Sequence, residues 1–338
     1  MMSAQTQAGI SEAGGDGQKR FRLLRAVLPW VLIILIFEYI FIYQVSLTDV
    51  IEAVKSANLG IFIPVFVIFF SVSYMFGLLH NYLAFNWLAG RTGFKELFFA
   101  RGASMLLAMV NPFAGAGGLG LWLSRKKQVP ALEATGIILL VLFTDLVILF
   151  TAASAGALLI ASDVGGSGDL ISRQEEMSLL WFCLIFLAVL IFDIVVWVKK
   201  PKTRFLSFYF RGPLSVFERV RLKHFVILCS LCACYFCCQF FMHYFLLRTF
   251  GAEVKLIHII CFLPLVYLIV TIPITPLQLG TSQAAWIFFF SRFADEPTIL
   301  AYSILISFAS ILTCSIIGSA CMPWAYKDLV ETRKKAGG

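Results

Sequence analysis

Two charged residues, Asp145 and Arg101, lie inside apolar stretches, where a charged side chain is energetically unfavourable. Asp145 lies near the middle of an apolar run over 131–161, next to Thr144, and Arg101 lies in an apolar run that ends at Asn111. A charged side chain at the centre of a membrane helix costs at least about 2.5 kcal/mol on insertion scales, so it faces the bundle interior and has a partner. We expect Arg101 to be the partner of Asp145. Both a functional site and a purely structural ion pair remain open for Asp145.

Nine cysteines raise the question of a metal or redox site. Five of them lie within 229–238, and His243 follows shortly after. Helical spacing scatters these five around the helix axis, and no second Cys/His group has the spacing of a zinc site. We therefore favour small packing residues in a membrane helix over a metal or redox site, and we predict neither metal nor cofactor.

Motifs typical of catalysis are missing from the sequence. It contains no nucleophile–base arrangement, no HExxH and no phosphate-binding P-loop, and the glycines over 115–120 do not follow a strand as a dinucleotide motif would. The histidines at 80, 243 and 258 lie near the ends of apolar runs, where we expect a position at the membrane interface. The sequence therefore predicts a protein that is not an enzyme.

Composition places these residues in a membrane protein. The 338 residues are 60% hydrophobic and only 14% charged, and the mean hydropathy is +0.90. A soluble domain is about a quarter charged. The net charge of +8 comes from short basic blocks between apolar runs, which favours cytoplasmic loops and excludes a nucleic-acid-binding surface.

Apolar runs of the length needed to cross a bilayer predict an all-α integral membrane protein with about six full transmembrane helices. They are 26–45, 59–88, 131–161, 178–198, 224–249 and 297–323. Residues 48–58 and 205–222 are mixed in character and predict short interfacial helices. We expect a disordered cytoplasmic tail over 1–18, a membrane domain over 19–326 and a basic cytoplasmic tail over 327–338.

Proline and glycine break two further apolar segments, which predict re-entrant hairpins. The first hairpin (97–123) breaks at Pro112 and the second hairpin (256–291) at Pro273. Each half is too short to span, and lipid cannot satisfy the backbone groups that the breaks expose. Glycine also allows close helix packing, so the glycines alone do not decide between a functional and a packing role.

Charge asymmetry orients these segments. With the N-terminal basic cluster inside, every basic block lies on the cytoplasmic side if the two hairpins enter from opposite faces. The first hairpin with its flanking helices (59–161) and the second with its flanking helices (224–323) then form an inverted repeat. Many transporters have this layout, with the substrate site where the broken helices meet.

The broken segments also resemble a known family. Residues from Pro112 to Arg125, the Val129-Pro130 turn and Thr144-Asp145-Leu146 are similar to the membrane domain of lysylphosphatidylglycerol synthases. Ile272-Pro273-Ile274-Thr275-Pro276-Leu277-Gln278-Leu279-Gly280 resembles the second Pro–Gly segment of that family. The resemblance covers roughly 20–325 and points to the standalone, flippase-like members that lack a synthase domain.

Some positions depart from the family pattern. The family commonly carries a Glu after each Leu-Gly pair, where this chain has Leu121 and Gln283. Arginines usual in the following helices are replaced near Phe143 and at about Ser303, whereas Asp145 matches. The resemblance therefore implies translocation of an amphipathic lipid and leaves the headgroup and any proton coupling undefined.

The leading hypothesis is a flippase-like protein of the cell (inner) membrane, with both termini cytoplasmic, that binds or translocates a phospholipid, glycolipid or isoprenoid lipid. Its partners would be membrane lipids, and a second copy or a separate lipid-modifying enzyme is also considered. A secondary transporter of a small solute and a partner of polyprenyl-linked glycosyl transfer are the alternatives. The predicted substrate-binding residues, from both hairpins, the adjoining basic block and the following helix, are Arg101, Asn111, Pro112, Gly115, Gly117, Gly118, Gly120, Arg125, Lys126, Asp145, Pro273, Pro276, Gln278, Gly280, Ser282 and Gln283.

Overall fold

A computed structural model describes residues 30–43, 45–161, 173–199 and 212–336, and the regular elements in these ranges are all helices. The expected tail over 1–18 lies outside them. In chain order the elements are a helix over Trp30–Tyr43, α2 (Leu47–Ser56), α3 (Leu59–Leu88), α4 (Phe94–Val110), α5 (Pro112–Lys127), α6 (Ala131–Ala161), α7 (Arg173–Lys199), η2 (Gly212–Arg219), α8 (Leu222–Arg248), α9 (Leu256–Thr271), η3 (Pro276–Gln278), α10 (Thr281–Phe290) and α11 (Glu296–Ala336).

Long apolar helices confirm the all-α membrane class. Five helices in the described ranges are long and apolar enough to cross a bilayer, in α3, α6, α7, α8 and α11. The sequence predicted a span over 26–45 and a separate short helix over 48–58, and the structure has a helix over Trp30–Tyr43 and α2 at these places. The two helices meet at 89° and as a pair would supply a sixth crossing. Outward-facing side chains on α7, including Phe182, Ile185 and Phe192, are exposed, and an apolar surface of this kind fits hydrocarbon.

The last helix is longer than expected. The apolar pattern predicted a span ending at residue 323 and a separate basic tail after 326. Instead α11 continues through Pro323 to Ala336. Trp324 stacks on Phe99 of α4 at a ring-centroid distance of 5.3 Å, which ties this part of the helix to the bundle.

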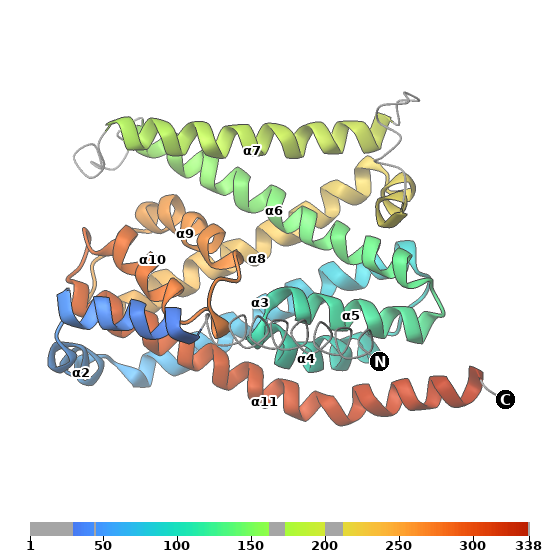
Figure 1. The fold of residues 1–338 in the computed structure, drawn as a ribbon, viewed down its shortest axis with the longest axis horizontal. Coiled ribbons are helices and arrows are strands. Elements are labelled where there is room, and N and C mark those ends of the chain that lie inside the picture. The colour runs from blue at the N-terminus through green and yellow to red at the C-terminus, as the bar shows by residue number, and fades with distance from the viewer. Residues whose placement is uncertain (1–29, 44, 162–172, 200–211, 337–338) are drawn as a thin grey trace, which may run out of the picture.

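Basic residues gather at one end of the bundle, called here the basic end (Figure 1). The helix ends that meet there are those of α3, α5 and α7 and the starts of α4, α6 and α8. Side chains join them: Arg219 pairs with Glu133, Lys126 pairs with Glu96 at 3.3 Å, and the Lys127 ammonium donates to the Arg91 carbonyl. At the opposite end, the Asn58 amide donates to the Thr249 carbonyl at 2.9 Å, joining α3 to α8.

Two helical hairpins extend into the bundle from opposite ends (Figure 1). α4 and α5 pack side by side and are joined at Asn111, while α9 and α10 pack together and are joined through η3. α4 also contacts η3, so the first hairpin reaches the turn of the second.

Helix packing follows a two-fold pattern in which each half of the chain holds the hairpin of the other. α3 packs on α8, α4 packs on α11, and α9 packs on α6. Glycines allow the two cross-contacts: a Cβ at Gly102 would lie 2.4 Å from the Cys321 Sγ, and one at Gly156 would lie 2.7 Å from the Cys261 Cα. Membrane helices associate largely through such close packing, since lipid is as apolar as leucine.

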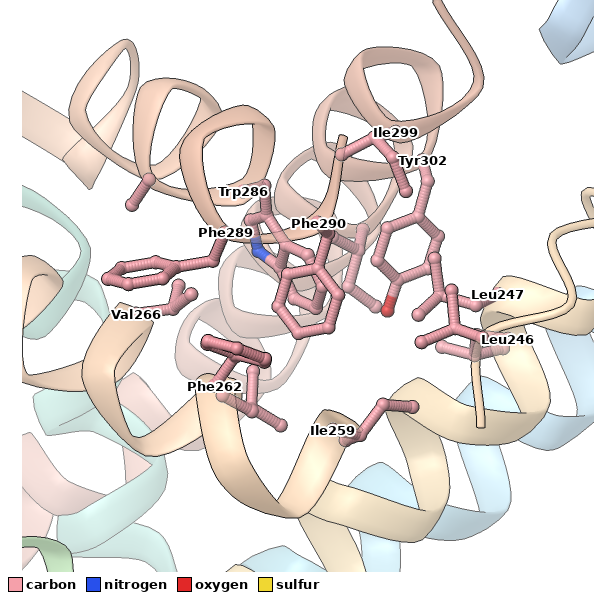
Figure 2. Close-up of a cluster of buried hydrophobic side chains, with 14 of the residues drawn as sticks. Leu246, Leu247, Ile259, Phe262, Val266, Trp286, Phe289, Phe290, Ile299 and Tyr302 are labelled. Carbon is pink, nitrogen blue, oxygen red and sulfur yellow. The ribbon is translucent and has the colours of Figure 1, made fainter. Parts of the chain in front are cut away.

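Two buried clusters make up the interior. One involves mainly α8 to α11 together with the start of α3, and the other mainly α3 to α6 with η2 and the start of α8. Figure 2 shows part of the first cluster, where Trp286 and Phe290 of α10 lie between Phe262 of α9 and Tyr302 of α11. These rings hold the second hairpin against its neighbours.

Candidate functional site

A cavity of about 680 Å³ lies between the two halves of the chain. Its walls come from α3, α4, α5 and α6 on one side and from α8, α9, η3, α10 and α11 on the other. The walls are largely apolar, with a small number of polar side chains between them. Pockets of this size and character are typical binding sites for amphipathic molecules.

Asp145 lies in this cavity within a small polar cluster. Its side chain is 43% exposed, and the cavity is where it is exposed. The Cys232 thiol donates to the Asp145 carboxylate at 3.1 Å, and the His80 Nδ1 lies 3.6 Å from the same oxygen. The other ring nitrogen of His80 is 2.9 Å from the Thr144 hydroxyl.

The hydrogen bonds around His80 determine how its protons are placed. The Thr144 hydroxyl donates to the Val141 carbonyl at 2.8 Å, so it accepts a hydrogen bond from the His80 Nε2. The Nδ1 then faces the carboxylate of Asp145. This contact is complementary only when a further proton lies on the imidazole or on the carboxyl group.

Arg101 also lines the cavity, but it is not the ion-pair partner of Asp145 as expected. Within the described residues its guanidinium forms no ion pair, and its buried Nε has no hydrogen-bond partner. The Arg101 Cζ lies 5.7 Å from the ring centroid of Tyr74, whose hydroxyl donates to the Phe98 carbonyl at 2.9 Å. The guanidinium also lies against Gly77, where a Cβ would come within 2.3 Å of the Arg101 Nη2.

A chain of neutral polar side chains crosses the half of the cavity formed by α8, α9 and α11. The Ser73 hydroxyl donates to the Gln239 side-chain oxygen at 3.1 Å, and the Gln239 amide donates to the Tyr267 hydroxyl at 3.2 Å. That hydroxyl is 2.8 Å from the His243 Nε2, and the His243 Nδ1 bonds the Tyr302 hydroxyl. The cavity thus has a charged part at Arg101 and Asp145 and a neutral hydrogen-bonding part here.

The residues at the turn of the first hairpin have local structural roles. Asn111 ends α4 and caps α5, its side chain accepting from the Phe113 amide at 2.8 Å, and Pro112 occupies the first turn of α5. The glycines that follow Pro112 lie within α5, whereas the sequence suggested an irregular glycine-rich segment between the two apolar halves of the first hairpin. A Cβ at Gly115 would lie 2.4 Å from the Ala108 Cβ, so this glycine allows α4 and α5 to approach closely.

The turn of the second hairpin is irregular. Leu277, Gln278 and Gly280 have φ values of 57°, 60° and 80°, a left-handed conformation that is uncommon for the first two residue types. Gln283, which is fully buried, holds the turn: its side-chain oxygen accepts from the Gly280 amide at 2.7 Å. Its side-chain nitrogen donates to the Ser303 carbonyl at 3.3 Å. Two of the positions that depart from the family pattern, Gln283 and Ser303, therefore touch.

The structure brings only part of the predicted site together. The predicted residues that line the cavity are Arg101, Pro112, Gly115, Asp145, Gln278 and Ser282. Those that do not line it are Asn111, Gly117, Gly118, Gly120, Arg125, Lys126, Pro273, Pro276, Gly280 and Gln283. Arg125 and Lys126 lie at the basic end, and the other residues of this second group support the two hairpins.

Sequence reasoning missed the neutral polar residues of the cavity. His80 and His243 are only 4% and 5% exposed, so both side chains lie in the protein interior, where they line the cavity. Helical spacing was the available signal, because Ser73, Gly77 and His80 form a stripe of small and polar residues on one face of α3. Within the described residues, no group of three Cys, His, Asp or Glu side chains is arranged to hold a metal ion.

Comparison with known proteins agrees with the resemblance seen in the sequence. A family model described as the lysylphosphatidylglycerol synthase TM region matches residues 25–318. None of the curated proteins compared with the chain matches it. The match includes both hairpins and every wall of the cavity.

Proposed function

Since the chain belongs to the family of lysylphosphatidylglycerol synthase transmembrane regions, we propose that it binds an amphipathic lipid in the cavity and translocates it across the cell membrane. The observation that carries the proposal is the cavity between two hairpins that extend from opposite ends of the bundle. A lipid headgroup needs polar partners within the membrane, and the polar side chains of the cavity supply them. Apolar walls suit the glycerol and upper acyl region of the same molecule.

The two-fold packing pattern supports alternating access. α4 rests on α11 and α9 rests on α6, so movement of one half of the chain against the other would open the cavity toward one end or the other. In this proposal the hairpins are re-entrant, the two halves form an inverted repeat, and both termini are cytoplasmic. The basic end then faces anionic lipid headgroups of the inner leaflet.

No chemical conversion of the lipid is part of this function. The cavity holds one carboxylate, Asp145, and its neighbours are the Cys232 thiol and the His80 ring. The partners are membrane lipids, with a second copy of the chain or a separate lipid-modifying enzyme as further candidates.

Reconstitution tests the proposal. Vesicles containing the protein and an acyl-labelled fluorescent phospholipid are treated with a membrane-impermeant quencher. Translocation increases the quenched fraction above that of protein-free vesicles. Ser310→Trp fills the cavity and should abolish the increase, because Ser310 lines the cavity.

Phe308→Trp is the matched control on the same helix, since Phe308 is 60% exposed on the outer face. It should retain the activity of the unmodified protein. Equal quenching with and without protein, for both phospholipid and glycolipid probes, would refute lipid translocation and favour transport of a small solute.

A further inference from the structure

We propose that Arg101 is the binding site for the phosphate group of an anionic lipid headgroup, an inference that rests on the proposed function and names its substrate class. Four features of the surroundings of Arg101 carry it: its missing counter-ion, its fixed position, the clearance at Gly77, and the charge inventory of the cavity.

The first feature is that no described carboxylate lies within ion-pair distance of the Arg101 guanidinium. Arginine keeps its proton in proteins, and a charge removed from water requires a partner of opposite sign. Among the described residues no carboxylate pairs with Arg101, and its buried Nε has no hydrogen-bond partner. Asp145, the carboxylate that shares the cavity, has the Cys232 thiol and the His80 ring beside it instead. The guanidinium thus retains donors for a ligand.

The second feature is that the guanidinium is held in position without using up those donors. The Tyr74 ring lies beneath the Arg101 Cζ at 5.7 Å, and the ring is itself anchored by its hydroxyl on the Phe98 carbonyl. Contact with an aromatic face leaves the N–H groups at the guanidinium edge available. A planar fork of donors matches two oxygens of a phosphate.

The third feature is the space made by Gly77. A Cβ there would lie 2.3 Å from the Nη2 and 3.1 Å from the Cζ of Arg101. Only glycine lets the guanidinium occupy this position against α3. Asn81 lies one turn further along α3, also lines the cavity, and donates its side-chain amide to the Gly77 carbonyl at 2.7 Å.

The fourth feature is the charge inventory, which favours an anion over a cationic headgroup. Among the residues that line the cavity, Asp145 is the sole carboxylate and Arg101 the sole permanent cation. A cationic aminoacyl headgroup would need free carboxylates, whereas Asp145 already accepts from the Cys232 thiol and has the His80 ring beside it. Beyond Arg101 the cavity offers neutral partners such as Gln239 and Tyr267, which fit the hydroxyl groups of a polyol.

Equilibrium binding to the purified full-length chain in a neutral detergent tests the inference. The probes are dioctanoyl-phosphatidylglycerol, dioctanoylglycerol with the same acyl chains and no phosphate, and inorganic phosphate as competitor. The unmodified protein should bind the phosphate-bearing lipid more tightly than dioctanoylglycerol. Arg101→Gln should lower the affinity for phosphatidylglycerol roughly 10- to 100-fold, the range for a charged hydrogen-bonded contact, and leave dioctanoylglycerol binding unchanged.

Two further variants keep the test decisive if Arg101→Gln does not fold. Arg101→Lys keeps the charge but loses the fork, and should weaken phosphatidylglycerol binding to an intermediate degree. Gly77→Ala displaces the flexible end of Arg101 without removing a charge, and should lower the same affinity. Arg248→Gln is the matched control, because the Arg248 Cζ also lies over a tyrosine ring, Tyr244 at 4.6 Å, but outside the cavity.

The outcomes separate the two proposals. Equal affinity for the two lipids, or a phosphate preference that survives both Arg101→Gln and Gly77→Ala, would overturn the role of Arg101 while leaving lipid binding intact. Failure of the unmodified protein to bind either lipid would overturn the proposed function itself. Binding of inorganic phosphate that displaces phosphatidylglycerol and exceeds it in affinity would identify a soluble anion, in place of a lipid, as the ligand of Arg101.

Discussion

The same substitution at two glycines, Gly117 and Gly156, should have different effects on stability. Gly156 lies in α6 where that helix crosses α9, and Gly117 lies in α5. A Cβ at Gly156 would lie 2.7 Å from both the Cα and the carbonyl oxygen of Cys261, whereas a Cβ at Gly117 would meet no atom within 4 Å. The atoms at Cys261 belong to the backbone, so a methyl group at Gly156 must push the two helices apart.

The expected magnitudes follow from two opposing effects. Replacing glycine by alanine inside a helix stabilises it by about 1 kcal/mol, and this gain applies at both positions. Overpacking a close contact costs about 1–3 kcal/mol, and only Gly156→Ala incurs it. Gly117→Ala should therefore be more stable than the unmodified protein by up to about 1 kcal/mol. Gly156→Ala should be less stable than Gly117→Ala by about 1–3 kcal/mol, because the helix-propensity gain cancels in the comparison.

Unfolding in mixed micelles with increasing sodium dodecyl sulfate, followed by tryptophan fluorescence, measures both variants under one condition. Equal stability of Gly156→Ala and Gly117→Ala would show that α6 and α9 do not approach as closely as described, and would remove the support for the two-fold packing of the halves. Gly117→Ala should also leave lipid binding unchanged, because Gly117 does not line the cavity.

Three further predictions test the hairpins, the polar chain and the orientation. Gln283→Ala leaves the buried Gly280 amide without its acceptor and should cost about 1–3 kcal/mol in the same unfolding titration; an unchanged midpoint would contradict the role of Gln283 in the turn. His243→Phe removes the side chain that links two tyrosine hydroxyls and should cost about 1–3 kcal/mol, and a variant as stable as the unmodified protein would argue against this hydrogen-bonded chain. In intact cells, a cysteine introduced at Glu253 should react with a membrane-impermeant maleimide, whereas a cysteine introduced at Gln128 should react only after permeabilisation. The labelling of each variant is compared with that of the unmodified protein. The reverse pattern would invert the proposed orientation.

Local sequence patterns predicted the scaffold of this protein well. The length of the apolar runs predicted the ends of α3, α6 and α8 to within two residues, because a membrane helix is recognised by its own composition. The break at Pro112 was also predicted from local sequence, since proline disfavours a continuous helix and is suited to the first turn of a new one, although α3, α9 and α11 continue through Pro64, Pro264 and Pro323. The resemblance to the family rested on these same segments, and the family match confirms it.

Long-range packing decided which side chains meet in the cavity. A local pattern could mark a polar face, such as that of Ser73, Gly77 and His80 on α3, but not the residues that this face meets. Arg101 and Asp145 were predicted as partners because both are charges in apolar runs, yet Asp145 has Cys232 and His80 as neighbours. Those neighbours come from α8 and α3, and only the packing of these helices around α6 brings them near. Which face of a helix meets which neighbour depends on segments far apart in the chain.

Asp145 and Arg101 show which properties of this protein the sequence determines and which depend on the tertiary structure. The sequence alone determined that this is a helical membrane protein with two broken segments and two charges at depth, because helix length, proline breaks and the cost of a charge in lipid are local properties. Tertiary structure alone decided that the His80 Nδ1 lies 3.6 Å from the Asp145 carboxylate and that the Arg101 guanidinium lies over Tyr74 with no ion pair to a described carboxylate. Those outcomes depend on how the two halves of the chain close around one cavity.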